Sequence, residues 1–377
     1  MKLVPIQQVA GHIKAGAPLP FGVRDAEGKL LLAKGQPVPN EQMREALLNR
    51  GVFVDMDELR DPSKRGADDG GAGGEDFFAR WEALQTRLSV LLRAPQETLF
   101  LPKVKECAAQ LIGWAERYPD QLLFVVIQHD HSRHEVYGLA HLLHTAAVAA
   151  LLSRRLAWAP ERQKSLVGAS LTMNLSIIDL QGRLASRGGK LAPVQRAAID
   201  RHPDEAVAWL RGAGLDDADW LAAVGQHHEQ PGGGGYPQGL AEPDETAQLL
   251  RLVDIFLAKL ASRGGRAGMP APLAAKSLYT GNNGHPFAAL LVKELGLYPP
   301  GTLVKLASGE TAVAVRRGTS GNTPIVSAVM NRHGDALGSP VRRDTAVAEH
   351  AITGLATAQT LRVKLSPHQL YDRRYEA

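Results

Sequence analysis

The sequence has 377 residues, enough for two or three domains, and its 44% hydrophobic and 22% charged content is ordinary for globular proteins. Its 43 basic and 39 acidic residues leave a formal net charge of +4, too small an excess to predict binding to a nucleic-acid polymer. The single cysteine excludes an intramolecular disulfide framework, and the most apolar windows are too short to cross a bilayer. We therefore expect a cytoplasmic protein with no membrane-spanning segment.

Residues 1–58 predict a small α+β accessory domain. The pattern indicates a hairpin that turns at 25–28, a helix capped by Asn40 and a returning strand at 52–54. No group of residues in this domain carries evident chemistry. Residues 59–76 are rich in acids and glycine and have little to bury, so they predict a flexible linker.

Helical spacing begins at residue 77. Apolar residues recur at intervals of three and four over 77–92, as one buried helix face requires. A second helix is expected over 104–117, between two prolines. These connecting helices, 77–119, either tie the linker to the main domain or form the surface of a homodimer.

Residues 120–298 predict a domain of successive helices, with a strand signal only near 124–127. Three alternating runs follow, at 302–306, 311–315 and 324–329. They predict a small antiparallel sheet within a C-terminal appendage over residues 299–365, and residues 366–377 are expected to be a frayed tail. The predicted fold class is therefore mainly α, with small β-containing modules at both ends.

One stretch of the helical domain is more distinctive than the rest. His227, His228 and Glu229 supply two imidazoles and a carboxylate, all potential metal ligands. The four glycines at 232–235 cannot continue a helix at low cost, so the preceding helix should end near Glu229. The stretch is typical of a helix end that delivers ligands to a shaped loop. The alternative is an ordinary surface loop after a helix that ends in His-His-Glu.

This stretch, with Gly235-Tyr236-Pro237 after the His-His-Glu, resembles the HHE…GYP signature of the HD-GYP family, and the resemblance extends over roughly 137–263. That family contains helical, metal-dependent phosphodiesterases that cleave cyclic di-GMP. The resemblance implies a helical HD-GYP-type domain, a cyclic dinucleotide as ligand and signalling proteins as partners. It places Gly235, Tyr236, Pro237 and Arg263 at the substrate.

The resemblance also implies a set of metal ligands. These are His144 and Asp254 at a first metal position, and His202, His227 and His228 at a second. Four other histidines match no ligand position and are interpreted as loop or surface residues: His129, His131, His134 and His141. Asp254 lies in an apolar helical run, where an unpaired carboxylate is costly, and this favours a metal, His or Arg partner over the alternative of a helix-surface acid.

One segment departs from the family pattern. Where the family has a His-Asp pair and then a Lys, this sequence has Met173, Asn174 and Ile177. The family's Asp bridges two metal ions, whereas a neutral Asn cannot supply the bridging charge and a Met thioether is a soft ligand, unsuited to Mn²⁺ or Fe²⁺. Loss of the Lys removes a cation that could offset charge on the phosphoryl group. We therefore expect no intact catalytic residue among these three positions.

Three imidazoles near Asn174 could still hold one ion with an open coordination position. The expected cofactor is accordingly a single divalent metal (Fe, Mn or Zn), or none. Three functions are compatible with the sequence. The first is a signalling protein that binds cyclic di-GMP or protein partners with little or no phosphodiesterase activity. The second is an active phosphodiesterase that uses the remaining His and Asp ligands, and the third is a pure protein-interaction scaffold.

Overall fold

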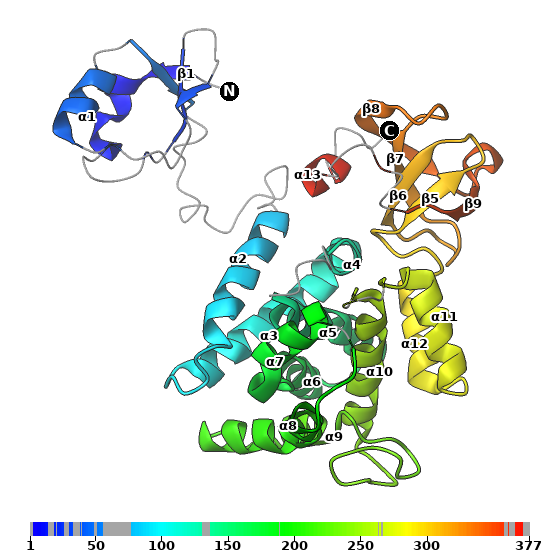
Figure 1. The fold of residues 1–377 in the computed structure, drawn as a ribbon. Helices are drawn as coiled ribbons and strands as arrows, with labels where there is room; N and C mark the ends of the chain where they lie inside the picture. The colour runs from blue at the N-terminus through cyan, green and yellow to red at the C-terminus, as the bar shows by residue number, and fades with distance from the viewer. Residues whose placement is uncertain are drawn as a thin grey trace. The chain divides into compact units, whose positions relative to one another are not determined.

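The computed structural model describes residues 3–13, 19, 21–25, 30–32, 38, 40–48, 51–55, 77–129, 136–187, 189–262, 264, 267–357, 361 and 366–371. The chain divides into two compact units, Met1–Gly73 and Gly74–Ala377 (Figure 1). The described part is mainly helical, with one small antiparallel sheet in each unit, which confirms the predicted fold class. None of its helices is long and apolar enough to cross a membrane.

The first unit is a small α+β module. Its sheet has the order β1-β4-β2-β3, formed by β1 (Leu3–Pro5), β4 (Phe53–Asp55), β2 (Val23–Arg24) and β3 (Leu30–Leu32). Helix α1 (Glu41–Leu48) begins where expected, because the Asn40 side chain accepts a hydrogen bond from the Met43 N–H at 2.9 Å. Strands β2 and β3 pair as the predicted hairpin. Most of its turn and the whole predicted linker, 59–76, lie outside the described residues.

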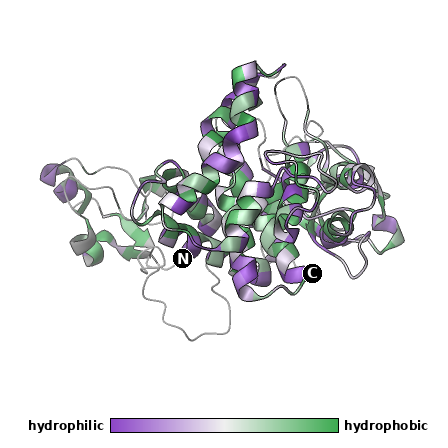
Figure 2. Ribbon diagram, turned by 90° about the horizontal axis from the view of Figure 1, so that it is seen from below, coloured by the Kyte–Doolittle hydropathy of each residue, from purple (hydrophilic) through white to green (hydrophobic). Residues whose placement is uncertain are grey.

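Helices make up the larger part of the second unit. They are α2 (Phe77–Leu91), α3 (Phe100–Arg117), α4 (Pro119–Ile127), α5 (Tyr137–Arg155), α6 (Pro160–Thr172), α7 (Ile178–Arg187), α8 (Pro193–Gly212), α9 (Ala218–Gln226), α10 (Glu245–Leu260), α11 (Ala271–Gly281) and α12 (Pro286–Leu295). Helix α5 is buried on nearly all sides, as its alanine-rich sequence allows, and packs against α3, α6, α7 and α10. The apolar residues of these helices form one core; Figure 2 colours them by hydropathy.

One helix favours the first of two alternatives left open by the sequence, and another corrects an expectation. The apolar face of α2, considered above as a dimer surface, is buried within the same chain, where Trp81 and Leu84 contribute to the core. The segment with a strand signal at 124–127 is part of helix α4. Pro119 starts that helix, and its apolar residues pack against α5, so tertiary packing overrides the local β preference.

The C-terminal sheet has five antiparallel strands in the order β8-β7-β6-β5-β9. They are β5 (Leu303–Leu306), β6 (Thr311–Arg316), β7 (Ile325–Met330), β8 (Ala336–Asp344) and β9 (Ile352–Leu355). The three predicted runs correspond to β5, β6 and β7. The sequence pattern missed β8 and β9 because both are edge strands with few buried residues. The expected frayed tail begins instead with a short helix, α13 (Pro367–Leu370), whose Leu370 is buried.

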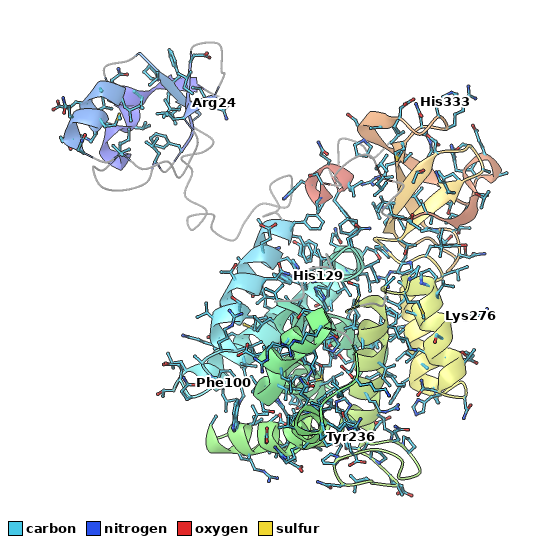
Figure 3. The ribbon with its side chains drawn as sticks, viewed as in Figure 1. Arg24, Phe100, His129, Tyr236, Lys276 and His333 are labelled. Carbon is cyan, nitrogen blue, oxygen red and sulfur yellow. The ribbon has the colours of Figure 1, made fainter. Side chains whose placement is uncertain are left out.

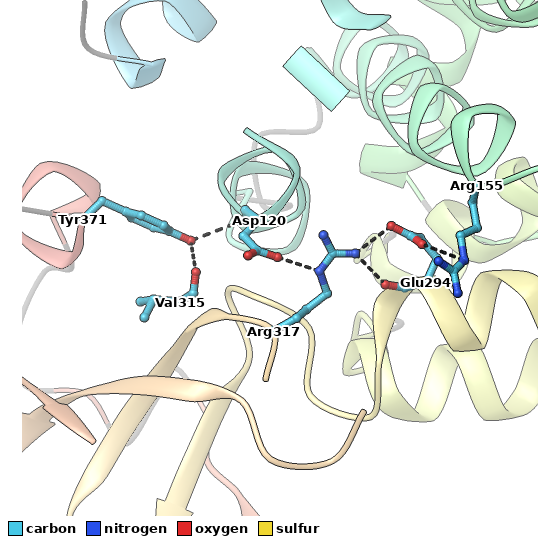
Figure 4. A network of polar contacts seen from close by, with 6 residues as sticks. All are labelled: Asp120, Arg155, Glu294, Val315, Arg317 and Tyr371. Atoms are coloured by element: carbon cyan, nitrogen blue, oxygen red, sulfur yellow. Dashed lines mark hydrogen bonds and ion pairs between the residues drawn. The ribbon is translucent and has the colours of Figure 1, made fainter. Parts of the chain in front are cut away.

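Ion pairs and hydrogen bonds join this sheet to the helices (Figure 4). The Arg317 guanidinium, just after β6, lies 2.6 Å from a carboxylate oxygen of Asp120 on α4 and 2.6 Å from one of Glu294 on α12. Glu294 also faces Arg155 at the end of α5, at 3.8 Å. The Tyr371 hydroxyl donates to a backbone carbonyl of β6 at 2.7 Å. The sheet is therefore fixed against α4 and α12, and Glu294 extends the network to the end of α5.

Candidate metal and phosphate site

Two helices bring three imidazoles together. His202 lies in α8, and His227 and His228 directly follow the last residue of α9, Gln226. The helix ends slightly before the expected position at Glu229. The ring nitrogens of the three histidines lie within 4.8 Å of one another, although 25 residues separate His202 from His227.

Hydrogen bonds fix which ring nitrogens carry protons. The Nδ1 atoms of His202 and His227 lie 2.6 Å from the carbonyl oxygens of Ile199 and Val224, respectively. Because a carbonyl only accepts, each Nδ1 donates its proton there. Burial lowers the pKa of His202 to about 3 and also lowers the pKa of His227. Both rings are therefore neutral, and both Nε2 atoms present lone pairs.

These two lone pairs face each other, since the Nε2 atoms of His202 and His227 are 3.1 Å apart. Two acceptors at that distance repel unless a cation lies between them. Two imidazole nitrogens bound tetrahedrally to one ion at about 2.0–2.1 Å would be about 3.3 Å apart. The donor set thus fits a divalent metal ion, with His228 as a third neutral ligand.

The loop after α9 supports His228. Its ring stacks on Tyr236, with centroids 4.6 Å apart and an interplanar angle of 21°, and burial holds the pKa of His228 well below its ordinary value. The Arg196 guanidinium lies 5.7 Å from the centroid of the Tyr236 ring. Figure 3 labels Tyr236 in this loop between α9 and α10. Tyr236 therefore limits the orientation of a proposed metal ligand.

Glu229 is not oriented as a ligand. Its fully buried carboxylate accepts hydrogen bonds from the backbone N–H groups of Gln238, Gly239 and Leu240, at 2.6, 3.1 and 3.0 Å. Gly235 lies so close to this turn that an added Cβ would be 2.4 Å from the Cα of Glu229. The acid of the His-His-Glu stretch therefore holds the glycine loop closed upon the histidines, a role that charge-assisted hydrogen bonds suit.

A fourth histidine, His141 on α5, faces Asp254 on α10. Its Nε2 lies 2.6 Å from the Asp254 carboxylate. Burial acts to raise the pKa of Asp254, but the hydrogen bond and electrostatic attraction to His141 outweigh it, and the pKa lies below its ordinary value. His141, which the sequence pattern assigned to the surface, is only 4% exposed.

His144, the histidine chosen from the sequence, lies elsewhere. Its ring stacks on Trp81 at 5.9 Å between centroids and meets the His129 ring edge-on at 4.5 Å. It does not line the cavity that contains His141 and Asp254. The two histidines are one turn apart on α5, so both are candidate site residues in the sequence. Only the packing of α5 against α10 shows which of them faces Asp254. We therefore replace His144 by His141 in the proposed site.

His202 and His228 line a cavity of about 900 Å³, and the fully buried His227 does not. Its lining includes five polar groups of the proposed site: His141, Asn174, His202, His228 and Asp254. The cations Arg187, Lys190 and Lys259 also line it. The buried Oδ1 of Asn174 has no hydrogen-bond partner among the described residues, and such an orphaned acceptor suits a cation or donor supplied by a ligand.

The other residues expected at the site have different environments. Ile177 and Tyr236 line the cavity, whereas Gly235 and Pro237 lie in the loop behind it. Met173 is completely buried in the hydrophobic core and does not line the cavity, so its thioether is a packing group. Arg263 lies outside the described residues.

The helical domain is similar to known proteins. A family described as HD domain matches residues 109–285. The cyclic di-GMP phosphodiesterase PA4108 of Pseudomonas aeruginosa is 26% identical over 215 residues, which cover 56% of this chain and 51% of that protein. The 3'3'-cGAMP-specific phosphodiesterase 3 of Vibrio cholerae is 30% identical over 171 residues, 43% of this chain and 36% of that protein. The chain thus spans about half or less of the curated relatives it matches.

A solved structure shares the fold. It is Bd1817, an HDG"Y"P protein from Bdellovibrio bacteriovorus, with a TM-score of 0.52 and 18% identity over 78% of this chain and 98% of that one. Residues 109–285 of this chain thus match an HD domain, in keeping with the resemblance of the sequence to the HD-GYP family.

Proposed function

We propose that the cavity binds a cyclic dinucleotide around a single divalent ion and hydrolyses it slowly or not at all. The observation that supports this most directly is the pair of neutral Nε2 atoms of His202 and His227, 3.1 Å apart, beside an Asn174 oxygen that has no partner in the described structure. The named activities of the two relatives, on cyclic di-GMP and 3'3'-cGAMP, favour a cyclic dinucleotide as the ligand.

The proposed roles follow from the chemistry of each side chain. His202, His227 and His228 would hold the ion, which when bound acts as a Lewis acid toward a phosphodiester oxygen. Arg187, Lys190 and Lys259 would bind the ligand's phosphates, since they add positive charge to the same wall. Tyr236 would keep the His228 ring in place.

The reason for slow turnover is the missing anionic bridge. Asn174 is neutral, and the carboxylate of Asp254 is engaged with His141 at 2.6 Å. No carboxylate among the described lining residues is left to hold two cations side by side. We expect one bound ion, so the pocket would recognise phosphodiesters better than it cleaves them.

Elemental analysis of the purified full chain tests the metal count. We expect about one Mn, Fe or Zn per chain, and a clear reduction in His202→Ala. Calorimetric titration with cyclic di-GMP should show saturable binding that a chelator weakens. Two ions per chain would contradict the single-ion proposal, and absence of both metal and nucleotide would favour a protein-interaction scaffold, with signalling proteins or a second copy as partners.

Active hydrolysis is the second candidate. Two of the three imidazoles, His202 and His228, line a cavity of about 900 Å³, so a ligand can reach an open coordination position. Turnover of cyclic di-GMP with added Mn²⁺ should be compared between the natural chain and the Met173→His, Asn174→Asp double variant. Gain of activity only in the variant supports the proposed impairment. Rapid hydrolysis by the natural chain would establish the second candidate instead.

A further inference from the structure

A second cavity, of about 610 Å³, lies where the C-terminal sheet meets the turn between α3 and α4. It shares no lining residue with the histidine cavity. Its volume falls within the range of small-molecule sites, roughly 300–1,000 Å³. Four arginines line it, namely Arg117, Arg316, Arg342 and Arg343. This concentration of guanidinium groups is unlike the lining of an ordinary surface depression.

The strand register explains how the arginines meet. Strand β6 ends at Arg316, which pairs with Ile325 at the start of β7, and Ile325 pairs with Asp344 at the end of β8. The ends of β6 and β8 and the start of β7 therefore lie together at one end of the sheet. Arg342 lies two residues before the end of β8, and Arg117, the last residue of α3, approaches from the helical side.

Several charges near the cavity are already neutralised. Asp120 pairs with Arg317, as described above, and Arg343 makes two hydrogen bonds to the carboxylate of Glu310, at 3.0 and 3.1 Å. These four residues therefore contribute little net charge to a ligand in the cavity. The charge that a ligand would meet is determined by the remaining groups.

Those groups are mainly cationic. In the described part of the chain, Arg117 and Arg316 form no ion pair, and Arg342 donates a hydrogen bond to the Ser327 hydroxyl. The opposing charge in the lining is Asp344, whose carboxylate accepts from the Ala346 N–H at 2.9 Å. Arg117 and Arg316 thus carry charge that no described carboxylate pairs, and a concave wall with an excess of one charge concentrates its field on whatever enters.

The cavity also has an apolar side. Val315, Ile325 and the ring of Tyr371 line it beside the arginines. The planar guanidinium fork matches phosphate oxygens in a bidentate geometry, whereas apolar and aromatic groups suit an attached organic moiety. We propose that this cavity binds the phosphate group of a small phosphorylated molecule of about mononucleotide size. This site is separate from the proposed cyclic-dinucleotide pocket and does not depend on it.

Calorimetric titrations of the full chain test the proposal with three ligands: adenosine 5′-monophosphate, inorganic phosphate and adenosine. A chelator is included, so that metal in the histidine cavity does not contribute. The test variant is Arg117→Gln with Arg316→Gln, both exposed side chains whose change leaves the core intact. The matched control is Arg332→Gln, an exposed arginine at the opposite end of the sheet in the turn between β7 and β8.

We expect the nucleotide to bind saturably and the double variant to bind it about tenfold or more weakly. A hydrogen bond to a charged group contributes about 1.5–3 kcal/mol, and about 1.4 kcal/mol corresponds to a tenfold change in affinity. The control variant should bind as the natural chain does. Equal affinity for nucleotide and inorganic phosphate would show that the cavity recognises only the phosphate group. Tighter binding of the nucleotide would show that it recognises an organic phosphate. Adenosine binding as tightly as the nucleotide, no saturable binding at millimolar ligand, or equal binding by the double variant would each overturn the proposal.

Discussion

His141 Nε2 lies 2.6 Å from the Asp254 carboxylate and thereby links α5 to α10 at the edge of the histidine cavity. The pair explains why a carboxylate is tolerated in an otherwise apolar helix: it has a charged or hydrogen-bonding partner one helix away. Of the two α5 histidines, His141 lines the cavity and His144 does not.

The first prediction compares these two histidines. His141→Ala should leave Asp254 without its partner, lower the free energy of unfolding by about 2–3 kcal/mol and weaken cyclic di-GMP binding. His144→Ala should affect stability through lost stacking on Trp81 but leave ligand affinity nearly unchanged. Chemical denaturation and calorimetry measure the two effects. Equal loss of affinity in both variants would argue against the replacement of His144 by His141.

The second prediction concerns thermal stability in the presence of metal. An ion that binds only the folded chain adds about 2.7 kcal/mol when its concentration is a hundred times its Kd. Adding Mn²⁺ or Zn²⁺ to the metal-free protein should therefore raise the Tm by several degrees, and a chelator should reverse the shift. His202→Ala should abolish it. An unchanged metal-induced shift in that variant would place the ion at another site.

The third prediction concerns the loop anchor. Glu229→Gln keeps one acceptor oxygen but loses the charge and the second acceptor that serve three backbone N–H groups. We expect a loss of about 2 kcal/mol in stability and faster hydrogen exchange at Gln238–Leu240. Glu242→Gln, an exposed acid in the same loop, is the control. Unchanged exchange in the Glu229 variant would show that the glycine loop holds its shape without the carboxylate.

The fourth prediction is a pH dependence. Hydrogen bonds from Arg343 hold the pKa of Glu310 below its ordinary value. Because the folded pKa is the lower one, this pair stabilises the fold fully above the unfolded pKa, roughly pH 4.3, and the contribution is lost as pH falls through the folded pKa. Glu310→Gln should remove a contribution of about 1 kcal/mol at neutral pH and less at pH 3. Tm measured in both proteins over this range checks it; a constant difference would contradict it.

The fifth prediction concerns packing behind the site. A Cβ on Gly168 would lie 2.3 Å from the Trp220 ring, which is buried and donates its Nε1–H to the Thr172 hydroxyl at 2.8 Å. Gly168→Ala should therefore destabilise the domain by about 1–3 kcal/mol. Gly212→Ala, also helical but with no atom within 4 Å of the added Cβ, should be neutral or slightly stabilising. Denaturant midpoints distinguish the two, and equal midpoints would mean that Trp220 can move aside.

Local signals in the sequence were sufficient for helices such as α2 and α3 and for the histidine pair. The spacing of Trp81 and Leu84 predicted α2, and the glycine run predicted the end of α9, because helical periodicity and glycine's backbone freedom act over a few residues. The three predicted strands of the C-terminal sheet have the same local origin. The polar edge strands β8 and β9 were missed because hydrogen bonds to neighbouring strands, rather than a buried face, hold them.

By itself, the sequence indicated the family resemblance and the mainly helical fold, and it placed Asn174 where the resemblance expects an acid. The tertiary structure decided that His141 rather than His144 meets Asp254, that Glu229 holds the loop, and that Met173 is a core residue. Each of these depends on which face of one helix packs against another segment far along the chain. Spacing along a single helix cannot specify that choice, because residues one turn apart look equivalent until the neighbouring helix is in place.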